Sequence, residues 1–225
     1  MKSSNIRINE KIFFLIKICE VMLLIQIIRI CIVNTSFLFI EKTSFNNTLI
    51  NFILMSIFTI IIIVWSKKNS ENLSLIPNLN NNKNKIIYSI STVIIIFLIV
   101  STPIFNKEYS IGIIVSLIFS TIITPVFEEL LFRGFIWNQL KNYYKNELVI
   151  YMITTILFAI WHIGYFDSII LNMNAYNLTG NMLFVMLMKV LTGLIFGIII
   201  GFVRYKTKNT YSAILTHSIM NVFGR

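Results

Sequence analysis

Two adjacent glutamates, Glu128 and Glu129, directly follow the apolar run 111–127, and Arg133 comes four residues after the second of them. In a helix, Glu129 and Arg133 would share a face, where an ion pair could compensate one carboxylate and orient it. Glu128 would be rotated about 100° away and would have no such partner. The spacing therefore predicts one charge-compensated carboxylate and one that is free to act as a base.

The dipeptide Thr124-Pro125 precedes the two glutamates and has the pattern of a helix N-cap followed by a first helical residue. This pattern predicts that both carboxylates lie in the first turns of a helix, where the helix dipole favours anions. The alternative interpretation is that the acidic pair marks a solvated helix start and has no chemical role.

The only two histidines of the chain, His162 and His217, lie at or within apolar stretches. His162 follows Phe158 by one helical turn. His217 precedes Asn221 by one turn, so that its imidazole and the amide project from one helix face. A single histidine in such a position is more often a packed residue than a catalyst. Because both histidines accompany a paired glutamate, they predict a polar cluster inside a helical bundle.

This set of side chains is suited to the activation of a water molecule. A desolvated carboxylate can act as a general base, and a neighbouring imidazole could share the water directly or through a bound cation. A second imidazole and an amide one turn away are suitable donors for a developing oxyanion. The predicted chemistry is hydrolysis of an amide bond by water, without a covalent intermediate.

Other mechanisms of proteolysis within apolar helices lack their residues here. An aspartyl protease needs two aspartates, and Asp167 is the only one in the chain. A zinc protease of the His-Glu-x-x-His type is excluded because neither histidine is followed by glutamate. A serine protease would need Gly-x-Ser, and the nearest approach, from Gly112 to Ser116, has the wrong spacing. A glutamate-based hydrolase is the class of protease that remains.

The elements that would position these residues are too apolar for a soluble protein. Hydrophobic residues make up 56% of the 225 residues, charged residues make up only 12%, and the mean hydropathy is +0.80. A soluble domain usually carries about twice that share of charge. A net charge of +10 would suggest nucleic acid in a soluble chain, but here most of the apolar surface must face lipid. The composition predicts an integral membrane protein whose partner is the lipid bilayer and not a nucleic acid.

Seven apolar stretches predict an all-α, polytopic bundle of transmembrane helices. Six are long enough to cross about 30 Å of hydrocarbon, and the last would cross only if it is tilted or packed among its neighbours. Cys19 and Cys31 both lie in the first stretch, so neither a disulfide nor a cysteine metal site is expected. The stretches are 12–33, 48–65, 86–105, 111–127, 148–165, 182–203 and the short 210–223.

The basic residues predict the orientation of this bundle, because cytoplasmic segments are usually enriched in Lys and Arg. With the N-terminus inside and the C-terminus outside, the outer segments hold three basic residues: Lys42, Lys107 and Arg225. The predicted outer loop 163–181 holds no Lys or Arg. Twelve fall inside: Lys2, Arg7, Lys11, Lys67, Lys68, Lys83, Lys85, Lys141, Lys145, Arg204, Lys206 and Lys208.

Other charged and small residues within the apolar stretches are predicted to be structural. Arg29 and Lys189 lie near enough to the ends of their stretches for their side chains to reach the interface. Three glycines at intervals of four residues let another helix backbone approach closely. These are Gly193, Gly197 and Gly201.

Three motifs in this order resemble those of the CPBP family, also called the Abi family, which comprises CAAX prenyl endopeptidases and bacteriocin-processing enzymes. None of the motifs carries a substitution, and together they use both histidines of the chain. The resemblance covers about residues 110–225. It divides the chain into N-terminal transmembrane helices without a motif (1–105) and a catalytic helical core (106–225). The motifs are EExxxR from Glu128 to Arg133, FxxxH ending at His162, and HxxxN from His217 to Asn221.

The resemblance implies a multi-helix intramembrane protease whose site opens toward the cytoplasmic side. It assigns Glu128 and His162 to holding and activating the water, and His217 with Asn221 to an oxyanion site. The second glutamate and the arginine of the first motif match supporting positions. A divalent metal such as zinc, if bound, would be held by Glu128, His162 and His217. The alternative is a glutamate-dependent mechanism without metal.

Bacterial members of this family are linked to the processing of pheromone, leader and bacteriocin peptides, to self-immunity and to the regulation of sensor kinases. The bias toward Ile, Asn and Lys is typical of AT-rich genomes and favours a low-GC Gram-positive bacterium, in which no prenylated substrate is expected. The predicted function is that of an endopeptidase of the bacterial plasma membrane that cleaves a membrane-bound peptide or protein. The alternative is a non-proteolytic membrane protein that modulates a partner such as a sensor kinase, or gives bacteriocin self-immunity.

Overall fold

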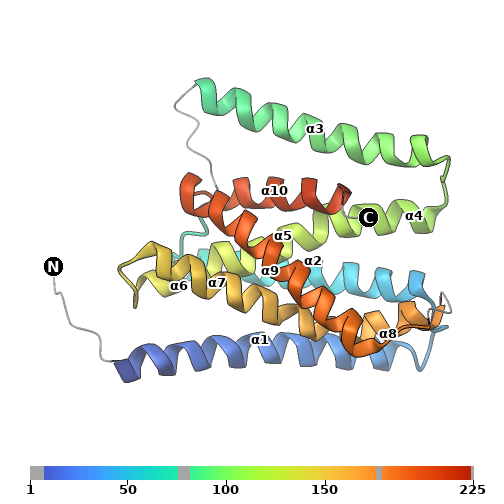
Figure 1. Ribbon diagram of the computed structural model, residues 1–225, viewed down its shortest axis with the longest axis horizontal. Helices are drawn as coiled ribbons and strands as arrows, with labels where there is room; N and C mark the ends of the chain where they lie inside the picture. Colours follow the sequence, from blue (N-terminus) through green and yellow to red (C-terminus); the bar gives the residue numbers. More distant parts are fainter. Residues whose placement is uncertain (1–7, 76–81, 176–178, 224–225) are drawn as a thin grey trace.

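The computed structural model describes residues 8–75, 82–175 and 179–223, and within these ranges every secondary-structure element is a helix. The long helices extend along the longest axis of the molecule and alternate in direction from one to the next (Figure 1). The predicted all-α bundle is therefore confirmed. Outside the segment that carries the glutamates, its α-helices are α1 (Ile8–Ser36), α2 (Ser44–Lys68), α3 (Asn82–Asn106), α7 (Glu147–Trp161), α8 (Phe166–Ala175), α9 (Met182–Thr207) and α10 (Thr210–Phe223).

The segment 111–141, the central helix, is continuous and alternates α-helical with π-helical stretches. The prediction that Thr124 caps a new helix is wrong, because the residues before it are already helical and its N–H donates to the carbonyl of Phe119, five residues back. A π-helical stretch of this kind accommodates Pro125, which has no N–H to donate. The two glutamates therefore lie in mid-helix and not in a first turn. The stretches are α4 (Ile111–Ile118), η1 (Phe119–Ile123), α5 (Thr124–Glu129), η2 (Leu130–Ile136) and α6 (Trp137–Lys141).

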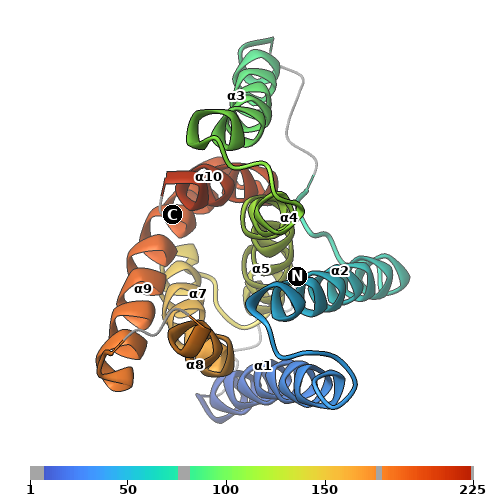
Figure 2. The same ribbon diagram turned by 90° about the vertical axis from the view of Figure 1, so that its right-hand side faces the viewer.

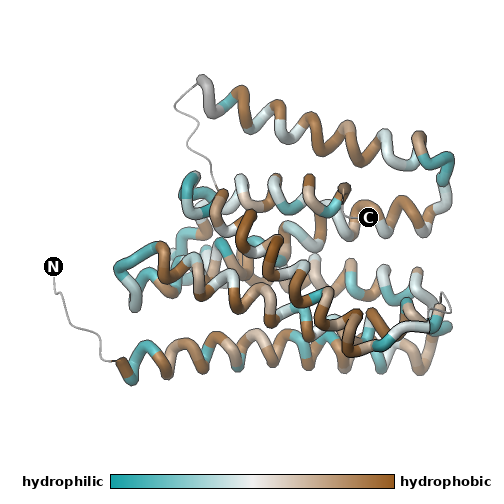
Figure 3. Tube along the Cα trace, viewed as in Figure 1, coloured by the Kyte–Doolittle hydropathy of each residue, from teal (hydrophilic) through white to brown (hydrophobic). Residues whose placement is uncertain are grey.

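Five helical stretches of the described chain are long and apolar enough to cross a membrane. Hydrophobic residues cover most of the helix lengths, and hydrophilic residues gather near the turns between helices (Figure 3). α1 and α10 are not among the five, so the seven-span count and the sides of the two termini remain predictions. Lys2, Arg7 and Arg225, which enter the predicted charge distribution, lie outside the described residues. The five are Ser44–Lys68, Lys85–Asn106, Ile111–Lys141, Glu147–Ala175 and Met182–Thr207.

The segment 163–181, predicted as an outer loop, is largely helical. α7 continues through a short 3-10 turn, η3 (His162–Tyr165), into α8, which ends at Ala175. Residues 179–181 lead without helix to α9, and 176–178 lie outside the described residues. His162 consequently lies at a transition within a long helical stretch and not at the end of a span.

Polar side chains determine where four of the helices begin. The oxygens of Thr43, Ser110, Asn146 and Asn181 accept hydrogen bonds from backbone N–H groups of the following turn, at 2.9–3.4 Å. Each cap satisfies an N–H group that a helix start leaves without an internal partner. These caps place the first turns of α2, the central helix, α7 and α9 along the bundle axis.

The glycine stripe of α9 packs closely against another helix, as predicted, and that helix is α7 with the 3-10 turn that follows it. An added Cβ at Gly193 would lie 2.6 Å from Nδ1 of His162, and one at Gly201 would lie 2.7 Å from the ring of Tyr151. At Gly197, between them, a Cβ would lie 3.3 Å from side-chain and backbone atoms of α7. The absence of side chains on this face of α9 therefore allows the close approach that brings α9 beside the first histidine.

α1 is joined to the first turn of α8 by a buried ion pair. Arg29 is only 1% exposed, and its Nη2 lies 2.6 Å from Oδ1 of Asp167 and 2.6 Å from the carbonyl oxygen of Gly164. Its Nη1 donates to Asn51 on α2 at 3.1 Å. The prediction that this arginine reaches the membrane interface is wrong, because the interior supplies a full set of acceptors for its guanidinium.

α3 stands at the edge of the bundle, beyond α10 and α4 (Figure 2). Two hydroxyl pairs join it to α10: Tyr88 with Ser212 at 2.8 Å, and Thr92 with Tyr211 at 2.9 Å. The remaining helices enclose the polar site, so α3 takes no direct part in forming it.

Candidate active site

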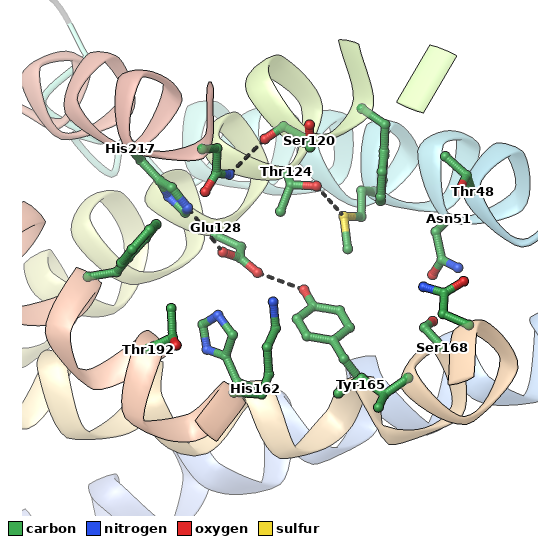
Figure 4. A pocket seen from close by; sticks show the side chains of 18 of the residues that line it. Thr48, Asn51, Ser120, Thr124, Glu128, His162, Tyr165, Ser168, Thr192 and His217 are labelled. Atoms are coloured by element: carbon green, nitrogen blue, oxygen red, sulfur yellow. Dashed lines mark hydrogen bonds and ion pairs between the residues drawn. The ribbon is translucent and has the colours of Figure 1, made fainter. Parts of the chain in front are cut away.

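A cavity of about 350 Å³ lies where α2, the central helix, η3, α8, α9 and α10 meet. Glu128 is the one carboxylate among the described residues that line it. Lys189 also lines the cavity and is exposed. Glu129 and Arg133 lie behind the wall. Four of the six predicted site residues line the cavity (Figure 4): Glu128, His162, His217 and Asn221.

Glu128, on α5, is only 1% exposed and is held by two donors from the segment that ends α7. The hydroxyl of Tyr165 donates to its Oε1 at 2.7 Å, and the indole N–H of Trp161 lies 3.2 Å from the same oxygen. The other oxygen, Oε2, lies 3.9 Å from Nε2 of His217, which is beyond hydrogen-bond distance. One oxygen of the carboxylate is thus fixed, while the other faces an imidazole with a gap between them.

His162 presents one ring nitrogen to the cavity because the other is bound to the backbone. Its Nδ1 lies 2.7 Å from the carbonyl oxygen of Phe158, one turn back. Because a carbonyl oxygen only accepts, Nδ1 carries the proton in the neutral ring and Nε2 keeps a free lone pair. Figure 4 shows the ring beside the cavity on the wall opposite Glu128. This tautomer leaves Nε2 of His162 able to accept a hydrogen bond.

Glu129 is fully buried and connects two of the other predicted residues. Its Oε1 lies 3.2 Å from Nη1 of Arg133 and 2.9 Å from Nδ1 of His217. The predicted ion pair with Arg133 is therefore present. A carboxylate at one ring nitrogen fixes the orientation of an imidazole, so Glu129 turns Nε2 of His217 toward Glu128.

Arg133 is buried between the central helix, α7 and α9. Its Nη2 donates to the carbonyl oxygen of Gly197 at 3.3 Å, and its guanidinium carbon lies 4.3 Å from the centre of the Phe158 ring. A guanidinium over an aromatic face is stabilised by a cation–π interaction. These contacts hold Arg133 beside Glu129 without exposing it to the cavity.

Asn221 lines the cavity and also satisfies a backbone group of the central helix. Its Nδ2 donates to the carbonyl oxygen of Ser120 at 2.7 Å. That carbonyl is open because the N–H of Thr124 is directed to Phe119 instead, and Pro125, the next residue, has no N–H. The π-helical stretch η1 thus creates an acceptor that positions the amide of the HxxxN motif.

Two residues that contact the cavity carboxylate, Trp161 and Tyr165, were not predicted from the sequence. They flank His162 in the segment Trp161-His162-Ile-Gly-Tyr165. The signal that could have revealed them is an aromatic residue with a polar group three or four positions from a motif residue, because such groups usually find a partner when they are buried.

The three predicted metal ligands, Glu128, His162 and His217, do not form a metal site in this arrangement. Within the described residues, no three His, Cys, Asp or Glu side chains are grouped closely enough to hold a cation. Each histidine is bound through Nδ1, which leaves its Nε2 able to ligate a cation, while one oxygen of the glutamate is engaged with Tyr165. It is therefore the spacing of the three side chains, and not their bonding, that does not fit the divalent metal allowed for by the family resemblance.

Comparison with known proteins identifies the family of the chain. A family model described as type II CAAX prenyl endopeptidase Rce1-like matches residues 110–223, just over half of the chain. The match begins one residue before α4 and ends with α10, so it contains all six predicted site residues. No curated protein and no solved structure matches the chain. The chain belongs to the Rce1-like type II CAAX prenyl endopeptidase family, a family of membrane proteases, and the resemblance inferred from its three motifs is confirmed.

Proposed function

We propose that this protein hydrolyses peptide bonds of membrane-associated peptides or proteins within the bilayer, and that Glu128 is the base that activates the attacking water. The observation that carries the proposal is the position of its carboxylate. It is the one carboxylate on the described cavity wall, with His162 on the opposite wall and Nε2 of His217 3.9 Å from its Oε2. Family membership supports the reaction class.

The attacking water lies between Glu128 and His162 in this proposal. Nε2 of His162 accepts one hydrogen bond, since its Nδ1 proton is committed to the backbone. Glu128 takes the proton as the water oxygen bonds to the carbonyl carbon of the substrate. The protonated carboxyl then returns that proton to the leaving amine as the carbon–nitrogen bond breaks. The products are an amine and a carboxylic acid, which then releases the second proton of the water, and no covalent enzyme intermediate forms.

His217 and Asn221 stabilise the oxyanion that develops on the substrate carbonyl. Glu129 holds Nδ1 of His217, so the protonated ring can donate from Nε2 into the cavity. The amide nitrogen of Asn221 carries two hydrogens; one is used on Ser120, and the other is available as a second donor. Donors held in place before the reaction contribute strongly to catalysis of this kind.

Peptidomics of membranes and culture medium tests this function. A strain that lacks the gene is complemented either with the wild type or with Glu128→Gln. We expect that at least one peptide or membrane protein accumulates uncleaved in the deletion strain, is cleaved with the wild type, and stays uncleaved with the variant. Equal complementation by Glu128→Gln, at equal membrane abundance, would instead support the alternative of a non-proteolytic protein that modulates a membrane partner or gives bacteriocin self-immunity.

A further inference from the structure

The cavity extends from Glu128 toward only one end of the bundle. Its wall includes Thr48 in the second turn of α2, Asn172 near the end of α8 and Lys189 in the third turn of α9. All three helix ends lie at the end of the molecule that carries the connections 37–43, 107–110 and 179–181 (Figure 1). In Figure 4, Thr48 and Ser168 lie on one side of the cavity, and His217 lies on the other.

Toward the opposite end of the bundle, the space beyond Glu128 is filled. Phe132, Arg133, Trp137 and Leu140, in the half of the central helix that follows, have no exposed surface. Their side chains pack against α7 and α9, as in the edge-on contact between Phe132 and Phe158. A substrate that reaches Glu128 therefore has an open path from one end and a packed core at the other.

The two ends also differ in charge. At the end with the cavity path, which we call the neutral end, the connections carry Lys42 beside Glu41 and Lys107 beside Glu108. The other end, which we call the basic end, carries the connections 69–75, 142–146 and 208–209. Its described helix ends and connections are rich in lysine, and the acidic residues among them are Glu10, Glu71 and Glu147. The lysines are Lys11, Lys67, Lys68, Lys85, Lys141, Lys145, Lys206 and Lys208.

We propose that the cavity opens to the extracytoplasmic side of the membrane, so that the protease takes its substrate from outside the cytoplasm. Lysine-rich connections usually remain in the cytoplasm, which places the basic end inside and the neutral end outside. The family resemblance implies a site that is open to the cytoplasm. That expectation is incompatible with this orientation, because the cavity extends toward the neutral end and the basic end is opposite it. The direction of the opening is independent of the proposed function. Only the statement that the ligand is a substrate rests on that function.

The lining of the path indicates the chemistry of that substrate. Between the neutral end and Glu128 the wall carries the amides of Asn47, Asn51 and Asn172 and the hydroxyl of Ser168. Several of these groups already bond to Arg29, to Ser44 or to one another, so they make the wall polar without all being free donors or acceptors. A polar wall suits an extended polypeptide backbone better than a hydrocarbon chain. The substrate class is therefore an exported peptide, or the outer end of a membrane protein, in extended conformation.

Cysteine labelling with a membrane-impermeant maleimide tests the direction of the opening. The full chain is expressed in a bacterial membrane after Cys19→Ser and Cys31→Ser, because both native cysteines are exposed. Single cysteines are then introduced by Asn172→Cys at the neutral end and Ser168→Cys in the path. Lys145→Cys at the basic end is the matched control. The fraction labelled is measured in intact cells and again after the cells are made permeable.

We expect Asn172→Cys and Ser168→Cys to be labelled in intact cells, and Lys145→Cys to be labelled only after permeabilisation. The reverse pattern would overturn the proposal, because the cavity would then face the cytoplasm. Protection of Ser168→Cys in both states would also overturn it, because the path would be closed to solvent. Labelling does not depend on cleavage, so the result is the same in a Glu128→Gln background. A failure of the proposed protease function would thus be distinguishable from a failure of the proposed direction of opening.

Discussion

Replacement by glutamine should destabilise the protein at Glu129 and leave its stability nearly unchanged at Glu128. Glu129 and Arg133 have no exposed side-chain surface, and their charged atoms lie 3.2 Å apart. Glu129→Gln removes one charge and leaves a buried guanidinium without compensation, which typically costs about 3–5 kcal/mol. For a chain of this length, that loss corresponds to a fall in melting temperature of roughly 6–20 °C. Glu128→Gln leaves no buried cation behind, and the amide oxygen can still accept from Tyr165.

The assay compares membrane abundance and melting temperature of the two variants and the wild type in the same detergent. Glu128→Gln should melt near the wild type, and Glu129→Gln should be scarce and melt lower. A double variant, Glu129→Gln with Arg133→Met, serves as the control. It removes the uncompensated charge and should recover part of the lost stability, because a buried pair replaced by neutral groups of similar size is often tolerated.

A specific result would refute this reasoning. If Glu129→Gln melts at the wild-type temperature, the ion pair does not stabilise the fold. The assignment of a structural role to Glu129 and a catalytic role to Glu128 would then be wrong. If the double variant is no more stable than Glu129→Gln, the loss comes from the bond to His217 and not from the buried charge.

Three further substitutions test the surroundings of the site. Gly193→Ala would place a methyl group 2.6 Å from Nδ1 of His162. We expect displacement of the imidazole to lower kcat about 10²-fold, with membrane abundance measured in parallel and unchanged. Asp167→Asn leaves buried Arg29 without its counter-charge and should cost about 3–5 kcal/mol in thermal melts, partly restored by Arg29→Met. Tyr165→Phe removes a hydrogen bond to a charged group worth about 1.5–3 kcal/mol and should lower kcat about 10- to 100-fold with little change in KM in steady-state assays.

The helices and the main polar cluster were predictable because both depend on local pattern. Apolar runs bounded by polar caps determine where helices lie, so the short stretch 210–223 coincides with α10. The i, i+4 spacing of Glu129 and Arg133 led directly to their ion pair. The glycine stripe indicated a close helix contact, although the sequence did not identify α7 as the partner.

The π-helical stretches were not predictable from local propensity. Thr124-Pro125 is a common helix start, and nothing in the preceding apolar residues shows that they continue the same helix. The helix survives the proline because η1 shifts the hydrogen-bond register and Asn221, about one hundred residues later, satisfies the freed carbonyl of Ser120. That hydrogen bond is a tertiary contact, and tertiary contacts cannot be predicted from local sequence.

The ion pair of Arg29 was missed for a similar reason. An arginine near the end of an apolar stretch usually extends to the interface. Here the carboxylate and the carbonyl that bind its Nη2 lie more than one hundred residues away, on Asp167 and Gly164. Asp167 is the only aspartate of the chain. A lone acidic residue and a lone basic residue at similar depth were therefore the available signal for this pair.

The central claim, that the carboxylate of Glu128 activates water for peptide hydrolysis, is tested most directly by initial cleavage rates. The peptide identified by peptidomics is incubated with purified wild type, Glu128→Gln, and Glu147→Gln as a control glutamate at the basic end of the bundle. We predict that Glu147→Gln cleaves at the wild-type rate and that folded Glu128→Gln is slower by about 10²- to 10⁴-fold. Cleavage by Glu128→Gln at the wild-type rate would contradict the account.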